Sequence, residues 1–329
     1  MAQAKILVTG ASGFAGGQLC RRLSADGHGV RALVREPARC TALKSWGVEL
    51  HRGDLRDRNS IKTAVQGVDL VYHIAASYRD SKASRKELWE TNVTGTQNML
   101  DAAKAADVAR FVHCSTIGVH GCIENPPANE ETPYAPGDDY QESKAAAERM
   151  VRNEMERGTL SIVIFRPAGI YGPGDLRFLK LFKAIKQRRF LMLGSGRITY
   201  HFVYIDDLID GILLCGNQEK SVGRIYILGG ESPITLNHLV ALIAQVLGVS
   251  PPALRLPVAP FYFAGYICEL VCKPLGLRPP LYRRRVDFFR KNRAFDISKA
   301  RVELGYDPKV SMAAGIDLTA QWYQSSGLL

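Results

Sequence analysis

A glycine-rich segment near the amino terminus constrains the fold of this chain more than any other feature. The segment GASGFAG, residues 10–16, follows a short apolar run at 5–9 and precedes a helical pattern at 17–25. Between a strand and a helix, Gly10 permits a tight turn, Gly13 lets backbone approach a pyrophosphate, and Gly16 lets the helix pack closely. Free N–H groups at the helix start attract phosphate. The segment predicts a dinucleotide site that also includes Ser12, Phe14 and Ala15.

Apolar runs and helical patterns alternate along the first half of the chain. We expect strands at 5–9, 30–34, 48–50, 70–74, 111–115 and 161–165, and helices at 17–25, 60–66, 86–106 and 142–157. This alternation predicts an α/β fold, a Rossmann-type doubly wound parallel sheet, over residues 1–165. Residues 166–329 are less regular, with helices expected at 178–186, 208–215 and 236–247 and a strand at 226–228. We expect a smaller C-terminal substrate lobe there, interleaved with the first domain.

The end of the second expected strand indicates which dinucleotide binds. NAD sites usually carry an acid there, which accepts a hydrogen bond from the ribose 2′-OH. This chain has Arg35, and a guanidinium pairs with a 2′-phosphate instead. Arg39 is placed to assist, and Glu36 is the competing acid. We therefore expect NADP to be preferred, with NAD possible, and Asp54 and Leu55 to meet the adenine.

Tyr140 and Lys144 are spaced to act together as a general acid/base. Four residues apart, the phenol and the ammonium lie on one helix face. A free tyrosine has a pKa of about 10, and a nearby ammonium favours its phenolate. The pair is therefore suited to exchange a proton with an alcohol or ketone. Ser115 and Thr116, at the end of the fifth expected strand, are both candidates to hold the substrate oxygen.

A second tyrosine–lysine pair with the same spacing occurs at Tyr78 and Lys82. It directly follows the fourth expected strand, and no hydroxyl at a strand end precedes it as Thr116 precedes Tyr140. We therefore interpret this second pair as part of a surface loop and assign the proton transfer to Tyr140.

These motifs together resemble the extended short-chain dehydrogenase/reductase family, in its epimerase/dehydratase branch. The resemblance covers nearly the whole chain and includes the segments 53–55 (GDL), 73–76 (HIAA), 92–96 (NVTGT), 166–174 (RPAGIYGPG), 203–207 (VYIDD) and 299–308 (KARVELGYDP). It implies that Tyr140 is the acid/base, that Lys144 holds the ribose and lowers the tyrosine pKa, and that Thr116 is the hydroxyl partner. It also implies cofactor contacts from Ala75, Ala76, Asn92, Pro167 and Ile170.

The net charge of +11 is concentrated in the second half of the chain. Residues 1–160 contain 21 Lys/Arg and 20 Asp/Glu, and residues 161–329 contain 22 and 12, giving +1 and +10. Such an excess indicates an anionic ligand or a solvated basic surface. The candidate anion-binding residues are Lys180, Lys183, Lys186, Arg188 and Arg189.

The substrate is less constrained than the cofactor. Members of this branch that act on nucleotide-sugars often carry an Asn where this chain has Gly169, and an Arg later than Arg197. The segment 166–175 instead resembles members that act on bulky apolar alcohols, such as hydroxysteroids and dihydroflavonols, and the apolar stretch 261–277 suits them. The basic cluster supports a nucleotide-sugar, which we expect first. The alternatives are an NADPH-dependent reductase or dehydrogenase of an apolar alcohol or ketone, and a non-enzymatic dinucleotide-sensing or RNA-binding relative.

Several features limit the remaining functional classes. No secretory signal pattern opens the chain, and its most apolar stretch, 258–272, is shorter than the roughly 20 residues of a membrane span. Seven scattered cysteines indicate reduced thiols, and no metal site is expected. We interpret His73 as a core histidine and Asp206 and Asp207 as a helix cap and dipole partner. We expect a cytoplasmic homodimer with a small-molecule substrate, no nucleic-acid partner and at most peripheral membrane contact.

Overall fold

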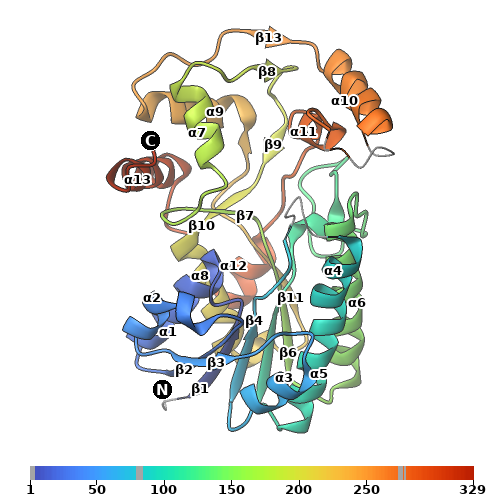
Figure 1. The fold of residues 1–329 in the computed structure, drawn as a ribbon, viewed down its shortest axis with the longest axis vertical. Coiled ribbons are helices and arrows are strands. Elements are labelled where there is room, and N and C mark those ends of the chain that lie inside the picture. The colour runs from blue at the N-terminus through green and yellow to red at the C-terminus, as the bar shows by residue number, and fades with distance from the viewer. Residues whose placement is uncertain (1–3, 79–83, 273–276, 278) are drawn as a thin grey trace.

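A seven-stranded parallel sheet forms the lower part of the molecule, and a smaller lobe lies above it (Figure 1). The computed structural model describes residues 4–78, 84–272, 277 and 279–329. The strands of the sheet are β1 (Lys5–Thr9), β2 (Gly29–Val34), β3 (Glu49–Arg52), β4 (Leu70–His73), β5 (Arg110–Cys114), β6 (Ile162–Pro167) and β11 (Ile225–Leu228). Every neighbouring pair in this sheet is parallel.

The strand order reverses beside β1, and this reversal determines where a ligand can bind. The order is β11-β6-β5-β4-β1-β2-β3, so the chain builds the sheet outward from β1 in both directions. The connections after β1 and β4 leave on opposite faces and open a crevice at the carboxyl ends of these strands. The predicted Rossmann-type doubly wound fold is confirmed.

Both faces of the sheet are buried, as β1 illustrates. Ile6 and Val8 belong to one core cluster and Leu7 to the other, because successive strand residues point to opposite faces. One face is covered by α1 (Phe14–Ala25), α2 (Thr41–Ser45), α8 (Ile205–Asn217) and α12 (Ser298–Leu304). The other is covered by α3 (Arg58–Ala64), α4 (Arg85–Trp89), α5 (Gly95–Ala105) and α6 (Asp139–Arg157).

The helix expected at 86–106 is interrupted. A π-helical segment, Glu90–Thr94, joins α4 to α5 and buries Asn92 within it. The Asn92 amide donates to the carbonyl oxygen of Ser77 (3.0 Å) and to Oγ of Ser143 (2.9 Å), and its oxygen accepts from the Ser77 N–H (2.7 Å). Segments of this kind often occur at functional sites, and here the interruption fixes the loop that follows β4.

The upper lobe comes from the second half of the chain. It contains three short strand pairs, β7 (Gly169–Tyr171) with β10 (Phe202–Tyr204), β9 (Thr199–Tyr200) with β12 (Ile234–Thr235), and β8 (Met192–Leu193) with β13 (Arg255–Leu256). Its helices are α7 (Leu179–Lys186), α9 (Leu236–Val246), α10 (Val258–Cys272), α11 (Arg283–Asp287) and α13 (Met312–Ser325). The same half of the chain also supplies β11, α8 and α12 to the sheet.

Helices α10 and α8 show how the second half departs from the sequence-based expectations. The stretch 258–272 forms a helix that the sequence analysis did not expect, and it tolerates Pro260 because a missing N–H in the first turn costs no helical hydrogen bond. Asp206 and Asp207 lie in the first turn of α8, as expected of partners for the helix dipole, but neither caps the helix. The N-cap of α8 is Tyr204, and Asp207 instead accepts from the backbone N–H groups of Lys309 (2.8 Å) and Val310 (3.1 Å).

Candidate active site

The loop between β1 and α1 adopts the conformation for which its glycines are suited. Gly10 has a φ of 72°, and a Cβ there would lie 2.8 Å from the backbone of Ala75. A Cβ on Gly16 would lie 2.3 Å from the carbonyl oxygen of Gly10. Among the described residues, no side chain caps the start of α1 at Gly13. The first N–H groups of α1 and the positive end of its dipole are therefore left for an anion, which fits a dinucleotide diphosphate.

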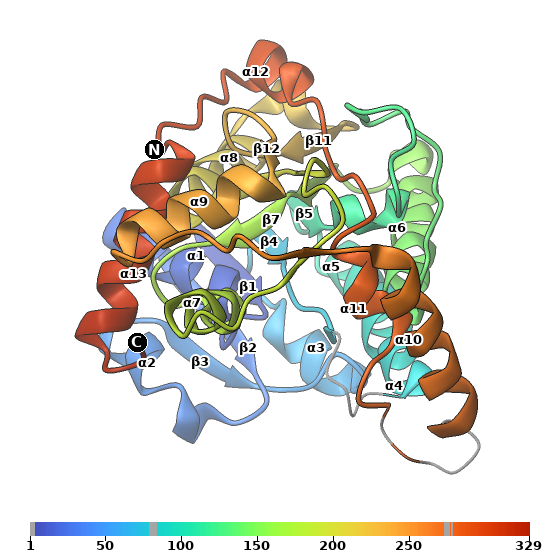
Figure 2. The ribbon, with the colours of Figure 1, turned by 90° about the horizontal axis from the view of Figure 1, so that it is seen from above.

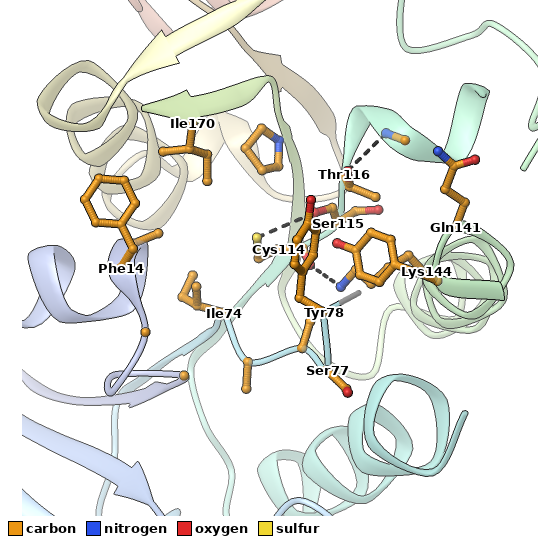
Figure 3. Close-up of a pocket in the computed structure, with 18 of the residues that line it drawn as sticks. Phe14, Ile74, Ser77, Tyr78, Cys114, Ser115, Thr116, Gln141, Lys144 and Ile170 are labelled. Carbon is orange, nitrogen blue, oxygen red and sulfur yellow. Dashed lines mark hydrogen bonds between the residues drawn. The ribbon is translucent and has the colours of Figure 1, made fainter. Parts of the chain in front are cut away.

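A cavity of about 800 Å³ extends from this loop along the carboxyl ends of the strands. Most of the predicted site residues line it: Gly10, Ser12, Gly13, Phe14, Ala15, Gly16, Arg35, Asp54, Leu55, Ala75, Ala76, Ser115, Thr116, Tyr140, Lys144, Pro167 and Ile170. Figure 3 shows Phe14 and Ile170 on one side of the cavity, and Tyr78, Thr116 and Lys144 on the other. The predicted phosphate loop and the predicted proton donor thus share one cavity.

Two residues that we expected at the cofactor are absent from the described cavity lining. Arg39 is exposed and pairs with Glu36 at 2.9 Å on the outer surface, because both belong to one short turn after β2. Asn92 is buried behind the wall, where it binds Ser77 and Ser143. A direct contact of either residue with the cofactor therefore stays a prediction, and Asn92 shapes the loop after β4.

Two arginines flank Asp54 where β2 and β3 end. Arg35 and Arg56 both line the cavity. Arg56 donates to the Asp54 carboxylate through Nε (3.0 Å) and Nη2 (2.7 Å). These bonds, together with the charges of Arg56 and Arg35, hold the pKa of the Asp54 carboxyl below its usual range. Sequence reasoning missed Arg56, although its position two residues after Asp54, at the edge where Arg35 lies, was an available signal.

The first turns of α6 carry the two predicted catalytic side chains. Asp138 caps the helix by accepting the N–H of Gln141 at 2.9 Å, which places Tyr140 in the first turn, 9% exposed. Lys144 is buried one turn later, and its Nζ donates to the carbonyl oxygen of Cys114 at 2.7 Å (Figure 3). Burial lowers the pKa of the Lys144 ammonium. The end of β5 therefore holds this lysine at the cavity that Tyr140 lines.

The two candidate hydroxyls at the end of β5 have different partners. The Ser115 hydroxyl is buried and donates to the carboxylate of Glu148, which forms a buried ion pair with Arg166. Oγ1 of Thr116 accepts the N–H of Gly118 at 3.0 Å, and an oxygen that accepts this bond keeps its own hydrogen to donate. The geometry thus leaves Thr116, and not Ser115, able to donate to a substrate oxygen.

Tyr78 lies on a loop and is 49% exposed, as predicted, but this loop borders the cavity. Its ring lines the cavity and meets the ring of Tyr140 edge to face, with centroids 5.0 Å apart. The loop after β4 turns toward α6 because Asn92 binds both backbone groups of Ser77. Lys82, the other member of the second tyrosine–lysine pair, lies outside the described residues.

Aromatic rings form the wall of the cavity beyond Tyr140. Tyr200 and Phe202 stack with centroids 5.6 Å apart, Phe288 packs on Tyr200 at 5.1 Å, and all three line the cavity. Sequence reasoning missed them, because they lie on two short strands and directly after a five-residue helix. The only local signal was the pair of aromatic residues two positions apart, before the segment 203–207.

Two basic side chains reach this half of the cavity, and each already binds a protein group. Lys291 pairs with the carboxylate of Asp287 at 3.0 Å. Arg293 donates to the hydroxyl oxygen of Tyr200 at 2.9 Å and lies over its ring, 5.2 Å from the centroid. A substrate phosphate here would share Lys291 with Asp287, whereas Arg293 keeps further N–H donors.

Two surfaces that the sequence associates with the substrate lie outside the cavity. Helix α7 buries Phe182 and Ile185 and turns its lysines to solvent, as its periodicity requires. None of the five basic residues proposed for anion binding lines the cavity, and no described residue of 261–277 does either. Helix α10 instead projects at the outer side of the lobe (Figure 2).

The interpretation of His73 as a core residue is confirmed. Its ring nitrogens are hydrogen-bonded to the hydroxyls of Thr9 (2.9 Å) and Thr96 (3.0 Å). In the part of the chain that the structure describes, no three His, Cys, Asp or Glu side chains gather as metal ligands. None of the described helices is long and apolar enough to cross a membrane.

Comparison with known proteins agrees with this cavity. Residues 6–229 match the model of the NAD dependent epimerase/dehydratase family. The chain is 33% identical to sterol demethylase protein B of Methylococcus capsulatus, over 98% of this chain and 99% of that protein. It is 30% identical to the 4-hydroxy-2-methyl-3-oxo-4-farnesyl-3,4-dihydroquinoline-1-oxide ketoreductase of Stigmatella aurantiaca, over 96% of each chain.

A solved structure supports the same assignment. The UDP-glucuronic acid 4-epimerase of Bacillus cereus, in complex with NAD, matches with a TM-score of 0.78 at 25% identity, over 98% of this chain and 99% of that chain. The glycine loop, the cavity and these matches agree with one another. The chain is an enzyme of the short-chain dehydrogenase/reductase type and belongs to the NAD-dependent epimerase/dehydratase family.

Proposed function

We propose that this enzyme interconverts a secondary alcohol and a ketone on a bulky, uncharged, apolar substrate. The observation that carries the proposal is the composition of the cavity beyond Tyr140. Aromatic rings wall it, and its two basic side chains are already paired with a carboxylate and a phenol. Burying apolar substrate surface against such rings favours binding by about 25 cal/mol per Å². A diphosphate instead requires cations that it can bind.

The names of the two relatives support the same substrate class. One name refers to a sterol, and the other to a ketone that carries a farnesyl chain. Both proteins align with almost the whole of this chain, so the lobe that contributes the aromatic wall lies within the matched region.

Each residue has a distinct task in the proposed reaction. Tyr140 exchanges the proton of the substrate hydroxyl, and Thr116 donates a hydrogen bond to the substrate oxygen. Lys144 holds a positive charge at the cavity, and an ammonium near a phenol lowers the phenol pKa. A nicotinamide, when bound, supplies or accepts the hydride. Phe202 and Phe288 orient the apolar body of the substrate.

The cofactor that the arrangement favours is NADP(H). Arg35 and Arg56 both reach the cavity where β2 and β3 end, and the competing acid Glu36 is paired with Arg39 outside it. Guanidinium groups bind a 2′-phosphate through charge-assisted hydrogen bonds. NAD is the alternative, since the solved epimerase is in complex with NAD.

A nucleotide-sugar is the second candidate substrate. Lys291 and Arg293 both reach the cavity, and the epimerase named above acts on UDP-glucuronic acid. Sequence analysis placed this class first because of the basic cluster at 180–189. That cluster lies outside the cavity, so we now place the apolar substrate first.

Turnover on a matched panel of substrates tests the proposal. The panel contains a 3β-hydroxysteroid, a long-chain 3-oxo acid ester, UDP-glucose and UDP-glucuronic acid, each assayed with NADP(H) and NAD(H). We expect turnover on the first two compounds, with a KM that Phe288→Ala raises about tenfold, because a large apolar contact is lost. Lys291→Gln and the surface control Lys183→Gln should leave this KM unchanged.

The nucleotide-sugar hypothesis makes the opposite prediction for the same variants. On that hypothesis only the UDP-sugars are turned over, and Lys291→Gln raises their KM about tenfold or more, because a charge-assisted hydrogen bond is lost. This result would overturn the proposal in favour of the second candidate.

A further inference from the structure

Helix α10 exposes its apolar stripe to solvent, where a surface helix normally buries it. Phe263, Tyr266, Ile267, Leu270 and Val271 are between 41% and 65% exposed. Their spacing of i, i+3, i+4, i+7 and i+8 places them on one continuous face of the helix. A contiguous exposed apolar surface of this kind marks an interaction site.

Polar contacts hold α10 in this orientation. The carboxylate of Glu269 accepts the backbone N–H of Arg283 at 2.8 Å and pairs with its guanidinium at 3.1 Å. Gly265 is buried and permits close packing, since a Cβ there would lie 3.0 Å from the backbone nitrogen of Arg283. Helices α10 and α11 lie side by side in both views (Figures 1 and 2). Turning the apolar stripe inward would break the ion pair and this packing.

Cations on tyrosine rings border the apolar stripe. Three guanidinium groups lie 4.1 to 5.2 Å from ring centroids, namely Arg283 over Tyr266, Arg290 over Tyr262 and Arg285 over Tyr282. Arg285 and Arg290 are exposed, and Arg290 also lies 3.8 Å from the carboxylate of Asp287. Tyrosine rings favour the membrane–water interface, and arginine binds the phosphates of anionic lipids. The tyrosines and arginines that border the stripe are therefore suited to contact lipid headgroups.

We infer that α10 docks this enzyme on the surface of an anionic lipid bilayer. The helix lies in the plane of the interface, with Phe263, Ile267 and Leu270 in the acyl boundary and the arginines at the phosphates. Its 15 residues span about 22 Å, so it lies on the bilayer and does not cross it. A second copy of the chain fits this face less well, because a symmetric pairing would bring the arginines of both copies together.

Helix α11 connects this docking surface to the cavity. Arg283 at its start is bonded to α10, and Asp287 at its end lines the cavity together with Phe288. An apolar substrate dissolved in the bilayer would meet the enzyme on the side of the lobe that α11 shares with the cavity. That consequence rests on the proposed function, whereas the docking itself does not.

Flotation of the full chain with lipid vesicles tests the docking. Vesicles of phosphatidylcholine alone are compared with an equimolar mixture of phosphatidylcholine and phosphatidylglycerol. We expect the chain to float with the anionic vesicles, and less so as salt rises, because salt screens the arginines. Phe263→Ser with Leu270→Ser should lower the fraction of chain bound to vesicles. The partition coefficient should fall at least about tenfold, because moving one such side chain from water into the bilayer already changes it by about this factor. Arg285→Gln with Arg290→Gln should weaken it about tenfold.

Matched controls separate docking from general effects of substitution. Val302 on α12 is 82% exposed, and Val302→Ser should leave flotation unchanged. Lys183→Gln with Arg189→Gln removes two exposed charges on the side of α7, away from α10 in both views, and should weaken flotation far less. Thermal unfolding of the Phe263/Leu270 variant should match that of the unchanged chain, because both side chains are exposed.

Three results would overturn the inference. The first is no flotation with either vesicle type at low salt. The second is an equal loss of flotation in the Val302→Ser control. The third is a dimer, seen by sedimentation velocity without lipid, that Phe263→Ser with Leu270→Ser separates while vesicles do not bind. In that last case the apolar stripe is an interface between two copies of the chain.

Discussion

Ser115 and Thr116 are neighbours at the end of β5, yet they serve different parts of the molecule. Ser115 also borders the cavity, but its hydroxyl donates to Glu148 in a buried polar network with Arg166. Thr116 lines the cavity and keeps a hydrogen to donate. The sequence alone did not decide which of the two holds the substrate oxygen. The alternation that separates the two sides of a strand ends at the last residue of the strand.

Substitution of these two residues should separate catalysis from stability. Thr116→Val should lower kcat about 10²-fold with little change in KM, because it removes a donor to the developing charge. Ser115→Ala should change kcat only a few-fold and lower the free energy of unfolding by about 1–3 kcal/mol, because Glu148 loses a buried donor. Steady-state kinetics and urea unfolding measure both effects. A loss of turnover in Ser115→Ala alone would reverse the assignment.

Arg35 should decide the choice of cofactor. A charge-assisted pair with a 2′-phosphate contributes about 1.5–3 kcal/mol, so NADP(H) should bind roughly tenfold to a hundredfold more tightly than NAD(H). Arg35→Asp should reverse this preference. Arg39→Asp is the matched control and should not, because Arg39 is paired on the outer surface. Calorimetric titration that finds equal or tighter NAD binding in the unchanged protein would remove Arg35 from this role.

At the scale of elements, the sheet was predictable and most of the upper lobe was not. Strands β1, β2, β4, β5 and β6 are mostly buried and therefore appear in the sequence as short apolar runs, whereas the edge strand β3 is only partly buried. Strands β7 to β10, β12 and β13 have two or three residues each, too few for any periodicity to be detected. They form by pairing with segments far along the chain, which a local pattern does not report.

The contact at the site that the sequence did not reveal has the same origin. Tyr78 approaches Tyr140 because Asn92, 15 residues from Ser77 in the sequence, binds the loop from below. No pattern around Tyr78 encodes that contact. The outward position of the lysines on α7 was predictable, by contrast, since Phe182 and Ile185 mark its buried face. This periodicity predicts the position of the α7 lysines better than the net charge of the second half, which had suggested an anion site.

Strand β5 also carries a histidine with an acid-sensitive environment. Both ring nitrogens of His113 are buried without a hydrogen-bond partner among the described residues, and its ring stacks on that of His73. Burial first, then the charge of Lys144, lowers the pKa of His113 well below its usual value and that of His73 to about 3. Both rings therefore stay neutral in the folded protein at pH values where an unfolded histidine, with a pKa of about 6.5, gains a proton.

The sign of the resulting pH dependence follows from linkage. The folded state is stabilised by these neutral histidines fully above about pH 6.5. This stabilisation is lost as the pH falls toward the folded pKa values, because the unfolded chain then binds more protons than the folded chain. His113→Leu should reduce the acid slope of the unfolding free energy by up to about 1.4 kcal/mol per pH unit. Urea unfolding between about pH 7 and pH 5 measures the slope. The exposed His238→Leu is the control, and identical slopes for His113→Leu and the unchanged chain would contradict the prediction.

At the scale of the whole molecule, the cavity draws on both halves of the chain. The first half supplies the phosphate loop, Thr116 and Tyr140, and the second supplies the aromatic wall and its paired cations. Part of the +10 of the second half lies on outer surfaces, in the exposed lysines of α7, in Arg188 and Arg189, and in Arg285 and Arg290, whereas α10 contains no lysine or arginine. We attribute the charge asymmetry to those surfaces and not to the substrate.

Transfer of deuterium from NADPH labelled at the nicotinamide C4 to a steroid ketone, followed by mass spectrometry, tests the Tyr140-dependent reduction most directly. The unchanged enzyme and Tyr78→Phe, which keeps the ring contact with Tyr140, should both label the product alcohol. Tyr140→Phe should bind NADPH with nearly unchanged affinity and transfer deuterium about 10²–10⁴-fold more slowly, because only the proton carrier is lost. Transfer at the normal rate in Tyr140→Phe, or its loss in Tyr78→Phe alone, would contradict the assignment of Tyr140 as the proton donor.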